Sequence, residues 1–310
     1  MTVSPGSPTL PRTEPCAPGS LPLAGRVVMV TEVSRRAGIG YAIACRAAQM
    51  GASLFLQHFS PHDAAQPWGA DDVACVVEAV RGHLVGQARL AHASADLADP
   101  AAPAALVAQA VSELGGLDAL VCNHAASGRD GTLAEVTAAD LDHHWQVNAR
   151  SSLLLVQALA EHQRGAGSGR PLPGPPGRSH PLAGPDLAED QPAPRPQLAT
   201  AVVLMTSGQG EGPMPSEIAY ATSKAALAGI TPSLAAGLAE DGIRLNTVNP
   251  GPVDTGYMSP ELIAALTPRF PGGRMPDPVD PARLITWLLT DDAAWVTGQV
   301  IATEGGFRRS

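Results

Sequence analysis

The fifteen residues RVVMVTEVSRRAGIG, from Arg26 to Gly40, decide the fold. The first six, RVVMVT, are a short apolar run rich in β-branched residues, which predicts a buried strand. The closing Gly38-Ile-Gly40 allows a tight turn, and the helical pattern that follows predicts a helix from Gly40 to Met50. A strand, a glycine-containing loop and a helix in this order are typical of the first unit of a doubly wound α/β sheet.

The same alternation continues along the rest of the chain. Strands are predicted at residues 26–31, 53–58, 88–93, 117–123, 201–206, 243–249 and 299–303. Helices are predicted between them at residues 40–50, 71–82, 101–114, 138–163, 220–239 and 281–289. Continuous apolar strands separated by helices indicate a parallel sheet covered on both faces. We therefore expect an α/β fold, a single-domain Rossmann-type doubly wound parallel sheet of about seven strands.

Two segments do not fit this alternation. Residues 1–22 are rich in proline and have no periodic apolar pattern, so we interpret them as a disordered leader. Residues 164–198 are rich in proline and glycine and also lack a core-forming pattern, which predicts a flexible surface insertion. The remainder of residues 23–310 suits one α/β domain.

Composition disfavours several classes of function. The formal charge is −9 and no basic run is present, so a nucleic-acid or anionic-membrane partner is not expected. No apolar stretch approaches the roughly 18 residues of a membrane span, and the N-terminus lacks a signal-peptide layout. The four cysteines have no metal-type spacing, which fits reduced thiols. We expect a cytoplasmic protein whose partner is a small molecule.

The glycine-containing loop is a candidate phosphate site. It would bring helix-terminal amides against a pyrophosphate. An NAD-type site places Asp or Glu near the end of the second strand to hold the ribose 2′-hydroxyl, but the sequence there reads Gln57-His58-Phe59-Ser60. Arg35 and Arg36 lie in the loop, where a guanidinium can pair with a 2′-phosphate. These residues favour NADP(H) over NAD(H); the alternative is that both arginines are solvated.

Ser207, Tyr220 and Lys224 are the candidate catalytic residues. Ser207 follows a predicted strand, and Tyr220 and Lys224 lie four residues apart on one helix face. A phenol with a pKa of about 10 exchanges its proton poorly at neutral pH. A nearby ammonium favours the phenolate and lowers that pKa, so we expect Lys224 to lower the pKa of Tyr220. The hydroxyl of Ser207 would orient a substrate oxygen.

Lys224 is the only lysine among the 20 basic residues. A compact ammonium can approach a phenol and bond ribose hydroxyls, whereas a planar guanidinium fits neither geometry well. Retention of lysine at this one position therefore favours a functional role. The alternative is a surface helix lysine beside a packed tyrosine.

These motifs together resemble the short-chain dehydrogenase/reductase family, from Leu23 to Gly306 apart from the proline-rich insertion. Within it the chain looks most similar to the 3-oxoacyl-[acyl-carrier-protein] reductase-like group. The resemblance implies hydride transfer between a nicotinamide and a carbonyl or secondary alcohol, with Tyr220 as the acid/base. Lys224 would hold the nicotinamide ribose, and Asn148 would anchor a water for proton relay. Family members are usually homotetramers or homodimers, so a homo-oligomer is implied.

The remaining site residues follow from the motifs and from this resemblance. The expected cofactor-binding residues are Thr31, Ser34, Arg35, Gly38, Ile39, Gly40, His58, Asp96, Leu97, Asn123, Ala125, Tyr220, Lys224, Pro250, Gly251, Val253 and Thr255. The expected substrate contacts are Gln209, Met214, Tyr257 and Met258. No metal site is expected. The apolar side chains of residues 257–273 predict a mobile lid, with a packed surface helix as the alternative.

Two departures from the family pattern affect the function. The loop is two residues longer than the common form, as in enoyl reductases, but those enzymes separate Tyr and Lys by six residues instead of three, so ketone/alcohol chemistry is favoured. Glu32 stands where the family has glycine, where a side chain can add roughly 1–3 kcal/mol of strain and a charge that repels phosphates. Either its side chain points to solvent or pairs with Arg35 or Arg36, or cofactor binding is lost.

Loss of cofactor binding would make the chain a non-catalytic nucleotide-sensing or scaffold protein. A further alternative within enzymes is a dehydratase or epimerase that uses the same tyrosine with a tightly held cofactor. Glu32 and the 164–198 insertion are the features that favour the first of these alternatives.

Overall fold

The computed structural model describes residues 21–165 and 199–309. The predicted leader, residues 1–22, and the predicted insertion, residues 164–198, lie outside the described residues except at their edges. Arg164 and Gly165 belong to a helix, so the insertion was predicted to start too early. Within the described part of the chain, no helix is long and apolar enough to cross a membrane.

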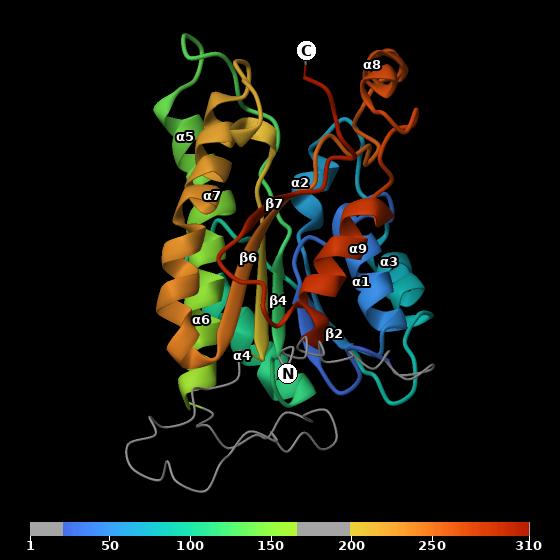
Figure 1. Cartoon of the computed structure of the whole chain (residues 1–310), viewed down its shortest axis with the longest axis vertical. Helices are drawn as coiled ribbons and strands as arrows, with labels where there is room; N and C mark the ends of the chain where they lie inside the picture. The colour runs from blue at the N-terminus through green and yellow to red at the C-terminus, as the bar shows by residue number, and fades with distance from the viewer. Residues whose placement is uncertain (1–20, 166–198, 310) are drawn as a thin grey trace, which may run out of the picture.

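The described strands form one seven-stranded sheet in the order β3-β2-β1-β4-β5-β6-β7 (Figure 1). They are β1 (Val27–Val30), β2 (Ser53–His58), β3 (Leu90–Ser94), β4 (Ala119–Cys122), β5 (Thr200–Met205), β6 (Ile243–Asn249) and β7 (Val300–Ala302). Every neighbouring pair is parallel. The predicted doubly wound sheet is confirmed. The strand order reverses between β1 and β4, where such a sheet opens a crevice at the carboxyl ends of its strands.

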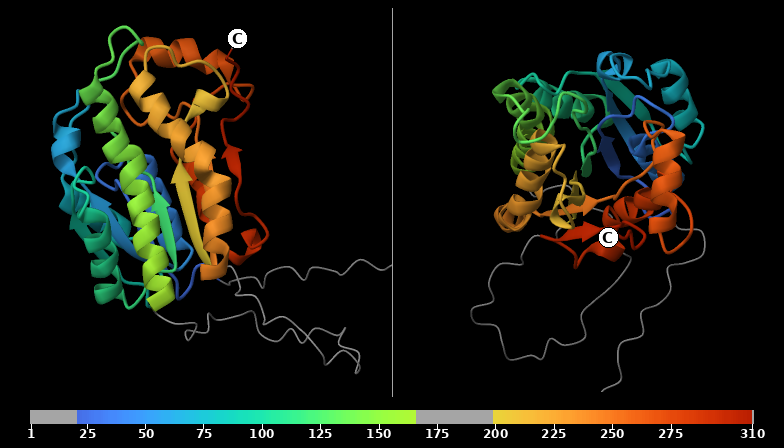
Figure 2. Two further views of the ribbon diagram at one scale, coloured as in Figure 1. Left: turned by 90° about the vertical axis from the view of Figure 1, so that its left-hand side faces the viewer. Right: turned by 90° about the horizontal axis from the view of Figure 1, so that it is seen from above.

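Helices cover both faces of the sheet (Figures 1 and 2). One layer holds α4 (Ala102–Leu114), α5 (Ala138–His144), α6 (Ser151–Gly165) and α7 (Ile218–Leu238). The other holds α1 (Ile39–Gln49), α3 (Val73–Arg81) and α9 (Val279–Leu288). The short helices α2 (Ser60–Ala64) and α8 (Pro260–Leu266) lie towards the end of the sheet to which the strands point.

The alternation of side chains along β1 shows why the strands are apolar throughout. Val28 and Val30 are fully buried in the core beneath α1 and α9. Val27 and Met29 point the other way and are buried in the core beneath α4 and α6. Since successive side chains point to opposite faces, a strand covered on both faces must be apolar at every position.

The observed helices differ from the predicted helices in two respects. The single helix predicted at residues 138–163 is divided into α5, a π-helical turn (Trp145–Arg150) and α6. The hydroxyls of Ser151 and Ser152 donate to the carbonyls of Val147 and Asn148 within this segment. Such local hydroxyl–carbonyl bonds are known to bend helices. No helix was predicted at α2, because five residues are too few to show a helical period. At α8 the structure has the helix that was the alternative to a mobile lid for residues 257–273.

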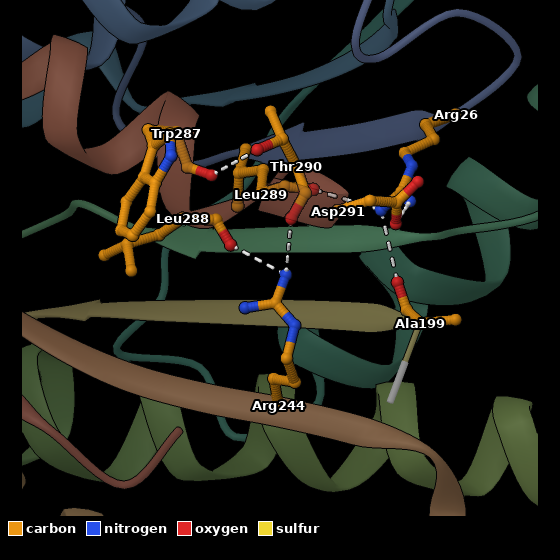
Figure 3. Close-up of polar contacts among 8 residues, drawn as sticks. All are labelled: Arg26, Ala199, Arg244, Trp287, Leu288, Leu289, Thr290 and Asp291. Atoms are coloured by element: carbon orange, nitrogen blue, oxygen red, sulfur yellow. Dashed lines mark hydrogen bonds and ion pairs between the residues drawn. The ribbon is translucent and has the colours of Figure 1, made fainter. Parts of the chain in front are cut away.

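Two buried arginines anchor the C-terminal end of α9 (Figure 3). Arg244 in β6 donates to the carbonyls of Leu288 at 2.9 Å and Thr290 at 3.1 Å. Arg26, just before β1, forms an ion pair with Asp291. Guanidinium groups satisfy the free carbonyls at a helix C-terminus and complement its dipole. Both arginines lie near the starts of their strands, so they anchor the helix far from the crevice.

Candidate active site

The carboxyl ends of the strands open into two adjoining pockets of about 210 Å³ and about 200 Å³. Glu32, Asp63 and Ala125 lie in the walls of both pockets, which therefore form one continuous cleft. The first pocket is also lined by Gln57, Phe59, His62, Asp96, Leu97 and His143. The second is also lined by Ser34, Arg35, Asn123, Tyr220, Lys224 and Pro250.

Two of the predicted catalytic residues, Tyr220 and Lys224, line the second pocket. Ser207, which follows β5, forms a side-chain hydrogen bond with Tyr220 of α7. Lys224, one turn further along α7, is only 2% exposed, and its Nζ donates to the carbonyl of Met205 at 3.0 Å. The same Nζ lies 5.7 Å from the centre of the Tyr220 ring. The alternative of a surface lysine is therefore wrong.

Burial dominates the acidity of the Tyr220 phenol. It raises the pKa of Tyr220 to about 12, because desolvation of the phenolate outweighs the hydrogen bond from Ser207. Burial likewise lowers the pKa of Lys224 to about 8, opposed by the carboxylate of Glu32. The expectation that Lys224 lowers the pKa of Tyr220 is thus wrong for this arrangement. At neutral pH the phenol therefore keeps its proton.

Asn148 lies in the π-helical turn, fully buried, and both ends of its amide are engaged. Its Oδ1 accepts from the amide of Ala126 at 2.6 Å. Its Nδ2 donates to Ser223 at 2.9 Å, and the Ser223 hydroxyl donates to the Tyr220 carbonyl at 2.7 Å. Single π turns inside α-helices are frequent at functional sites. Asn148 therefore ties the segment after β4 to the first turn of α7.

Asp130 fixes the start of α7 and was not singled out from the sequence. Its Oδ1 accepts from the amide of Ala219 at 2.9 Å, and its Oδ2 accepts from the amide of Tyr220 at 2.8 Å. Glu217 at the N-cap makes no side-chain cap, so Asp130 supplies the carboxylate that a helix N-terminus favours. Because Asp130 lies 90 residues away along the chain from Tyr220, local sequence patterns could not indicate this cap.

Asp130→Ala is expected to destabilise the fold by about 1–2 kcal/mol, as for loss of a strong helix cap. It should also lower kcat/KM, because the amide of Tyr220 loses its anchor. Thermal unfolding and steady-state kinetics check the two effects. Asp130→Asn keeps an acceptor and serves as the conservative control. Unfolding and kinetics of Asp130→Ala that match the native protein would contradict the capping role.

Glu32 turns into the cleft. Its φ of +58° is in the left-handed region, as the substitution of glycine predicts. Its Oε2 accepts from the amide of Ala125 at 2.8 Å. The expectation that the side chain points to solvent or pairs with Arg35 or Arg36 is therefore wrong. Arg35 donates to the carbonyl of Thr255 at 3.0 Å, and Arg36 pairs with the exposed Asp71.

The surroundings of Glu32 favour its neutral form. Burial, and then the carboxylate of Asp63, raise the pKa of Glu32 to about 8. The Ala125 amide, Lys224 and Arg35 oppose this rise. At neutral pH the side chain is consequently mostly protonated, and a neutral carboxyl does not repel a phosphate.

The glycine-containing loop packs closely enough to serve as a phosphate cradle. A Cβ on Gly40 would collide with the carbonyl oxygen of Glu32 and would lie 2.8 Å from Nδ2 of Asn123. Gly38 precedes α1 as its N-cap, and no side chain caps the helix there. Free amides at a helix N-terminus suit a pyrophosphate, and Lys224 at the other end of the cleft suits ribose hydroxyls. With Glu32 protonated, the residues present fit a nicotinamide dinucleotide.

The other predicted cofactor residues divide into those that line the cleft and those that support it. Lining residues are Ser34, Arg35, Gly38, Ile39, Asp96, Leu97, Asn123, Ala125, Pro250 and Thr255. Thr31, Gly40, His58, Gly251 and Val253 line neither pocket. His58 is instead buried against His92, with Nε2 3.1 Å from Nδ1 of that ring. Thr31 Oγ1 accepts from the amide of Asn123 at 2.9 Å and so braces the cleft.

The predicted substrate residues lie outside these two pockets. Tyr257 packs edge-on against Trp68, and its pKa is raised by partial burial and by the nearby phenol of Tyr220. Gln209 donates to Thr206, next to the catalytic serine. Met258 is buried, whereas Met214 is half-buried. Within residues 257–273, Phe270 is buried against Phe307 and α8 begins at a Ser259 cap, so part of the predicted lid is packed structure.

Two polar residues of the cleft were missed by the sequence reasoning. Asp63 in α2 is buried and accepts from the hydroxyl of Ser34 at 2.5 Å. His124 is buried between Thr31, at 2.8 Å, and Ser151, at 2.7 Å, and burial lowers its pKa to about 3. Asp63 could have been found only by predicting α2. Among the described residues, no cluster of three or more His, Cys, Asp or Glu side chains could hold a metal ion.

Comparisons with known proteins show the family of this chain. The family described as "Enoyl-(Acyl carrier protein) reductase" matches residues 33–169 and 189–308. The chain is 32% identical to the uncharacterized oxidoreductase YjdA of Bacillus subtilis, over 92% of this chain and 97% of that protein. It is 30% identical to the NADPH-dependent aldehyde reductase-like protein of Arabidopsis thaliana, over 93% and 96% of the two chains.

A solved structure has the same architecture. The crystal structure of a dehydrogenase/reductase from Sinorhizobium meliloti superposes with a TM-score of 0.71 at 29% identity, covering 93% of this chain and 96% of that one. The similarity in sequence and in fold extends over nearly the whole chain. The chain belongs to the short-chain dehydrogenase/reductase family and is an oxidoreductase of that type.

Proposed function

We propose that the protein reduces the carbonyl group of a partly hydrophobic ketone, such as a 3-oxoacyl-type substrate, with NADP(H), and catalyses the reverse oxidation of the secondary alcohol. The observation that carries the proposal is the hydrogen bond between Ser207 and Tyr220 beside the buried Lys224. Tyr220 and Lys224 line the second pocket at the carboxyl edge of the sheet, and Ser207 lies beside Tyr220.

The residues of this chain have separate tasks in the reaction. The nicotinamide, when bound, supplies or accepts the hydride. Tyr220 gives its proton to the carbonyl oxygen in reduction and removes it in oxidation. The Ser207 hydroxyl donates a hydrogen bond that positions the same oxygen. Lys224 holds the nicotinamide ribose, and Asn148 supports the route by which a proton reaches Tyr220.

The spacing of Tyr220 and Lys224 supports ketone chemistry over enoyl reduction. The matched family is described as an enoyl reductase, but enoyl reductases have six residues between the tyrosine and the lysine, whereas three lie between Tyr220 and Lys224. A panel of ketones, aldehydes, enoyl thioesters and secondary alcohols, followed by NADPH absorbance, tests the proposal. Turnover of enoyl thioesters without turnover of any ketone would contradict it.

We assign NADP(H) as the carrier from the residues of the cleft. β2 ends in Gln57 and His58 with no carboxylate to hold a 2′-hydroxyl, and Arg35 supplies a cation. The name of the Arabidopsis relative also specifies NADPH. Asp63 opposes this assignment, since its carboxylate lines both pockets.

We also propose that the protein is a cytoplasmic homo-oligomer and that its substrate is a small molecule.

The native protein is expected to have a lower KM for NADPH than for NADH. Asp63→Asn should widen this preference by about tenfold, equivalent to roughly 1.4 kcal/mol, because a carboxylate near the adenosine end repels a 2′-phosphate. Steady-state kinetics with both cofactors measure the ratio. Asp142→Asn removes an exposed carboxylate of α5 and is the matched control. A native preference for NADH would contradict the assignment.

A further inference from the structure

The C-terminal segment returns to the catalytic end of the sheet. Arg309 forms a two-point ion pair with Glu304, with Nη1 2.8 Å from Oε2 and a second, shorter contact from Nη2 to Oε1. Glu304 is 8% exposed and the Arg309 side chain 25% exposed, so the pair is largely withdrawn from solvent. The hydrogen bond to Glu304 raises the pKa of Arg309, which keeps the guanidinium charged.

Glu304 also forms a hydrogen bond with the segment that follows β6. The Nδ2 of Asn249 donates to Glu304 Oε1 at 2.8 Å, and the amide of Gly251 donates to Asn249 Oδ1 at 2.9 Å. Gly251 has a φ of +72°, and a Cβ there would lie 3.0 Å from the Glu304 side chain. Pro250, between these two residues, lines the second pocket. The ion pair is thus connected by side-chain hydrogen bonds to the wall of the cleft.

The same arginine packs against the segment that follows Ser207. A Cβ on Gly208 would lie 2.7 Å from Nη2 of Arg309. A Cβ on Gly212 would collide with Cδ of Arg309. Arg309 therefore lies against the backbone at both glycines, with its guanidinium at Gly208 and its aliphatic part at Gly212. The amide of Arg308 donates to the carbonyl of Arg269 at 3.0 Å, which holds the segment in place.

We propose that Arg309 is a positioning residue that clasps two catalytic segments, residues 207–212 and residues 249–251, through Glu304. This inference rests on the proposed function, because it assigns these segments to the substrate oxygen and the cofactor. Arg309 acts through other residues: it fixes the loop that carries Ser207 relative to the loop that carries Pro250. Arginine suits this task since its planar fork engages both carboxylate oxygens.

The clasp predicts a loss of catalytic rate out of proportion to any loss of stability. A misplacement of about 1 Å at a reacting group can cost roughly 100-fold in rate. Arg309→Ala is expected to lower kcat/KM for the carbonyl substrate by about tenfold or more, mainly through kcat. Arg309→Lys should restore only part of this loss, because an ammonium cannot bridge both oxygens of Glu304 in one plane. The melting temperature should change little.

Glycine substitutions test the same contact from its other side. Gly212→Ala places a methyl group where Arg309 lies and should reproduce the defect of Arg309→Ala. In the Arg309→Ala background it should add nothing further. Gly237→Ala, at an exposed position near the end of α7, is the matched control, since a Cβ there meets no atom within 4 Å. Arg308→Ala removes the neighbouring exposed arginine, and both controls should change kcat/KM less than twofold.

Hydrogen exchange tests the clasp without relying on turnover. In Arg309→Ala the amides of Glu211, Gly212 and Gly251, all hydrogen-bonded in the native chain, should exchange faster than in Arg308→Ala. Unchanged exchange at these amides, or equal kcat/KM losses in Arg309→Ala and Arg308→Ala, would overturn the proposal. If the native protein turned over no carbonyl compound, the proposed function would fail, while faster exchange would still support the contact between the two segments.

Discussion

Tyr220→Phe is expected to reduce kcat by about 10²–10⁴-fold, the contribution of a positioned general acid. We propose the phenol as the proton donor of the reaction. It is hydrogen-bonded to Ser207, and burial keeps its pKa at about 12, so it is protonated throughout the working range. Phenylalanine retains the ring and its packing beneath Lys224 while removing the proton. Stopped-flow or steady-state NADPH absorbance measures the loss.

Cofactor affinity separates a chemical role of Tyr220 from a structural one. The dissociation constant for NADPH should change only a few-fold in Tyr220→Phe, because Lys224 and the loop amides remain. Tyr41→Phe, in α1 outside the two pockets, supplies the matched control and should behave as the native protein. Near-native turnover of Tyr220→Phe would remove the acid/base assignment, and joint loss of binding and turnover would indicate a packing role.

The fold was predictable because it depends on a signal that is local in the chain. Strands buried on both faces, such as β1, are apolar at each position, and the helices between them are long enough to show a period. The candidate catalytic residues could also be picked out locally, since Tyr220 and Lys224 lie one helical turn apart and Ser207 follows a strand. Their acidity was not predictable, because it depends on how deeply the site is buried.

The contacts that surround the catalytic residues join distant parts of the chain. Asp130 caps α7 although it lies 90 residues away from Tyr220 along the chain. Arg309 contacts the backbone near Gly208, which is also far from it in the sequence. No spacing rule connects such pairs. The direction of the Glu32 side chain likewise depends on a free amide at Ala125, 93 residues further along the chain. Sequence reasoning identified the unusual residue correctly, but three-dimensional packing determines what it contacts.

Glu32→Gly is expected to tighten NADPH binding, with an effect that grows with pH. The substitution removes a non-glycine residue at a φ of +58°, where strain amounts to about 1–3 kcal/mol, and removes a carboxyl from the cleft. An anionic cofactor binds better when Glu32 is neutral, so binding favours the protonated form. As pH rises through about 8 the side chain ionises, and the dissociation constant of the native protein should rise by up to about tenfold per pH unit.

Glu32→Gln separates charge from strain. It keeps the Cβ at positive φ, so at pH 6 it should bind NADPH as the native protein does, while Glu32→Gly binds more tightly. At pH 9 glutamine should also bind more tightly than the native residue, because it cannot ionise. Lys224, with its pKa lowered to about 8, loses charge over the same range. In Glu32→Gln the pKa of Lys224 should fall further, because the Glu32 carboxylate no longer raises it, so loss of the lysine charge should weaken binding from a lower pH.

The same titrations decide between an enzyme and a nucleotide-sensing or scaffold protein. If the native chain binds NADPH at pH 6 to 7, protonation of Glu32 removes its repulsion of the cofactor phosphates. The outcome would favour an active enzyme. If binding is undetectable at every pH and appears only in Glu32→Gly, the native protein does not use the cofactor. Equal affinities of all three proteins for NADPH at both pH values would contradict the role given to Glu32. Neither the backbone strain at this residue nor its charge would then affect cofactor binding.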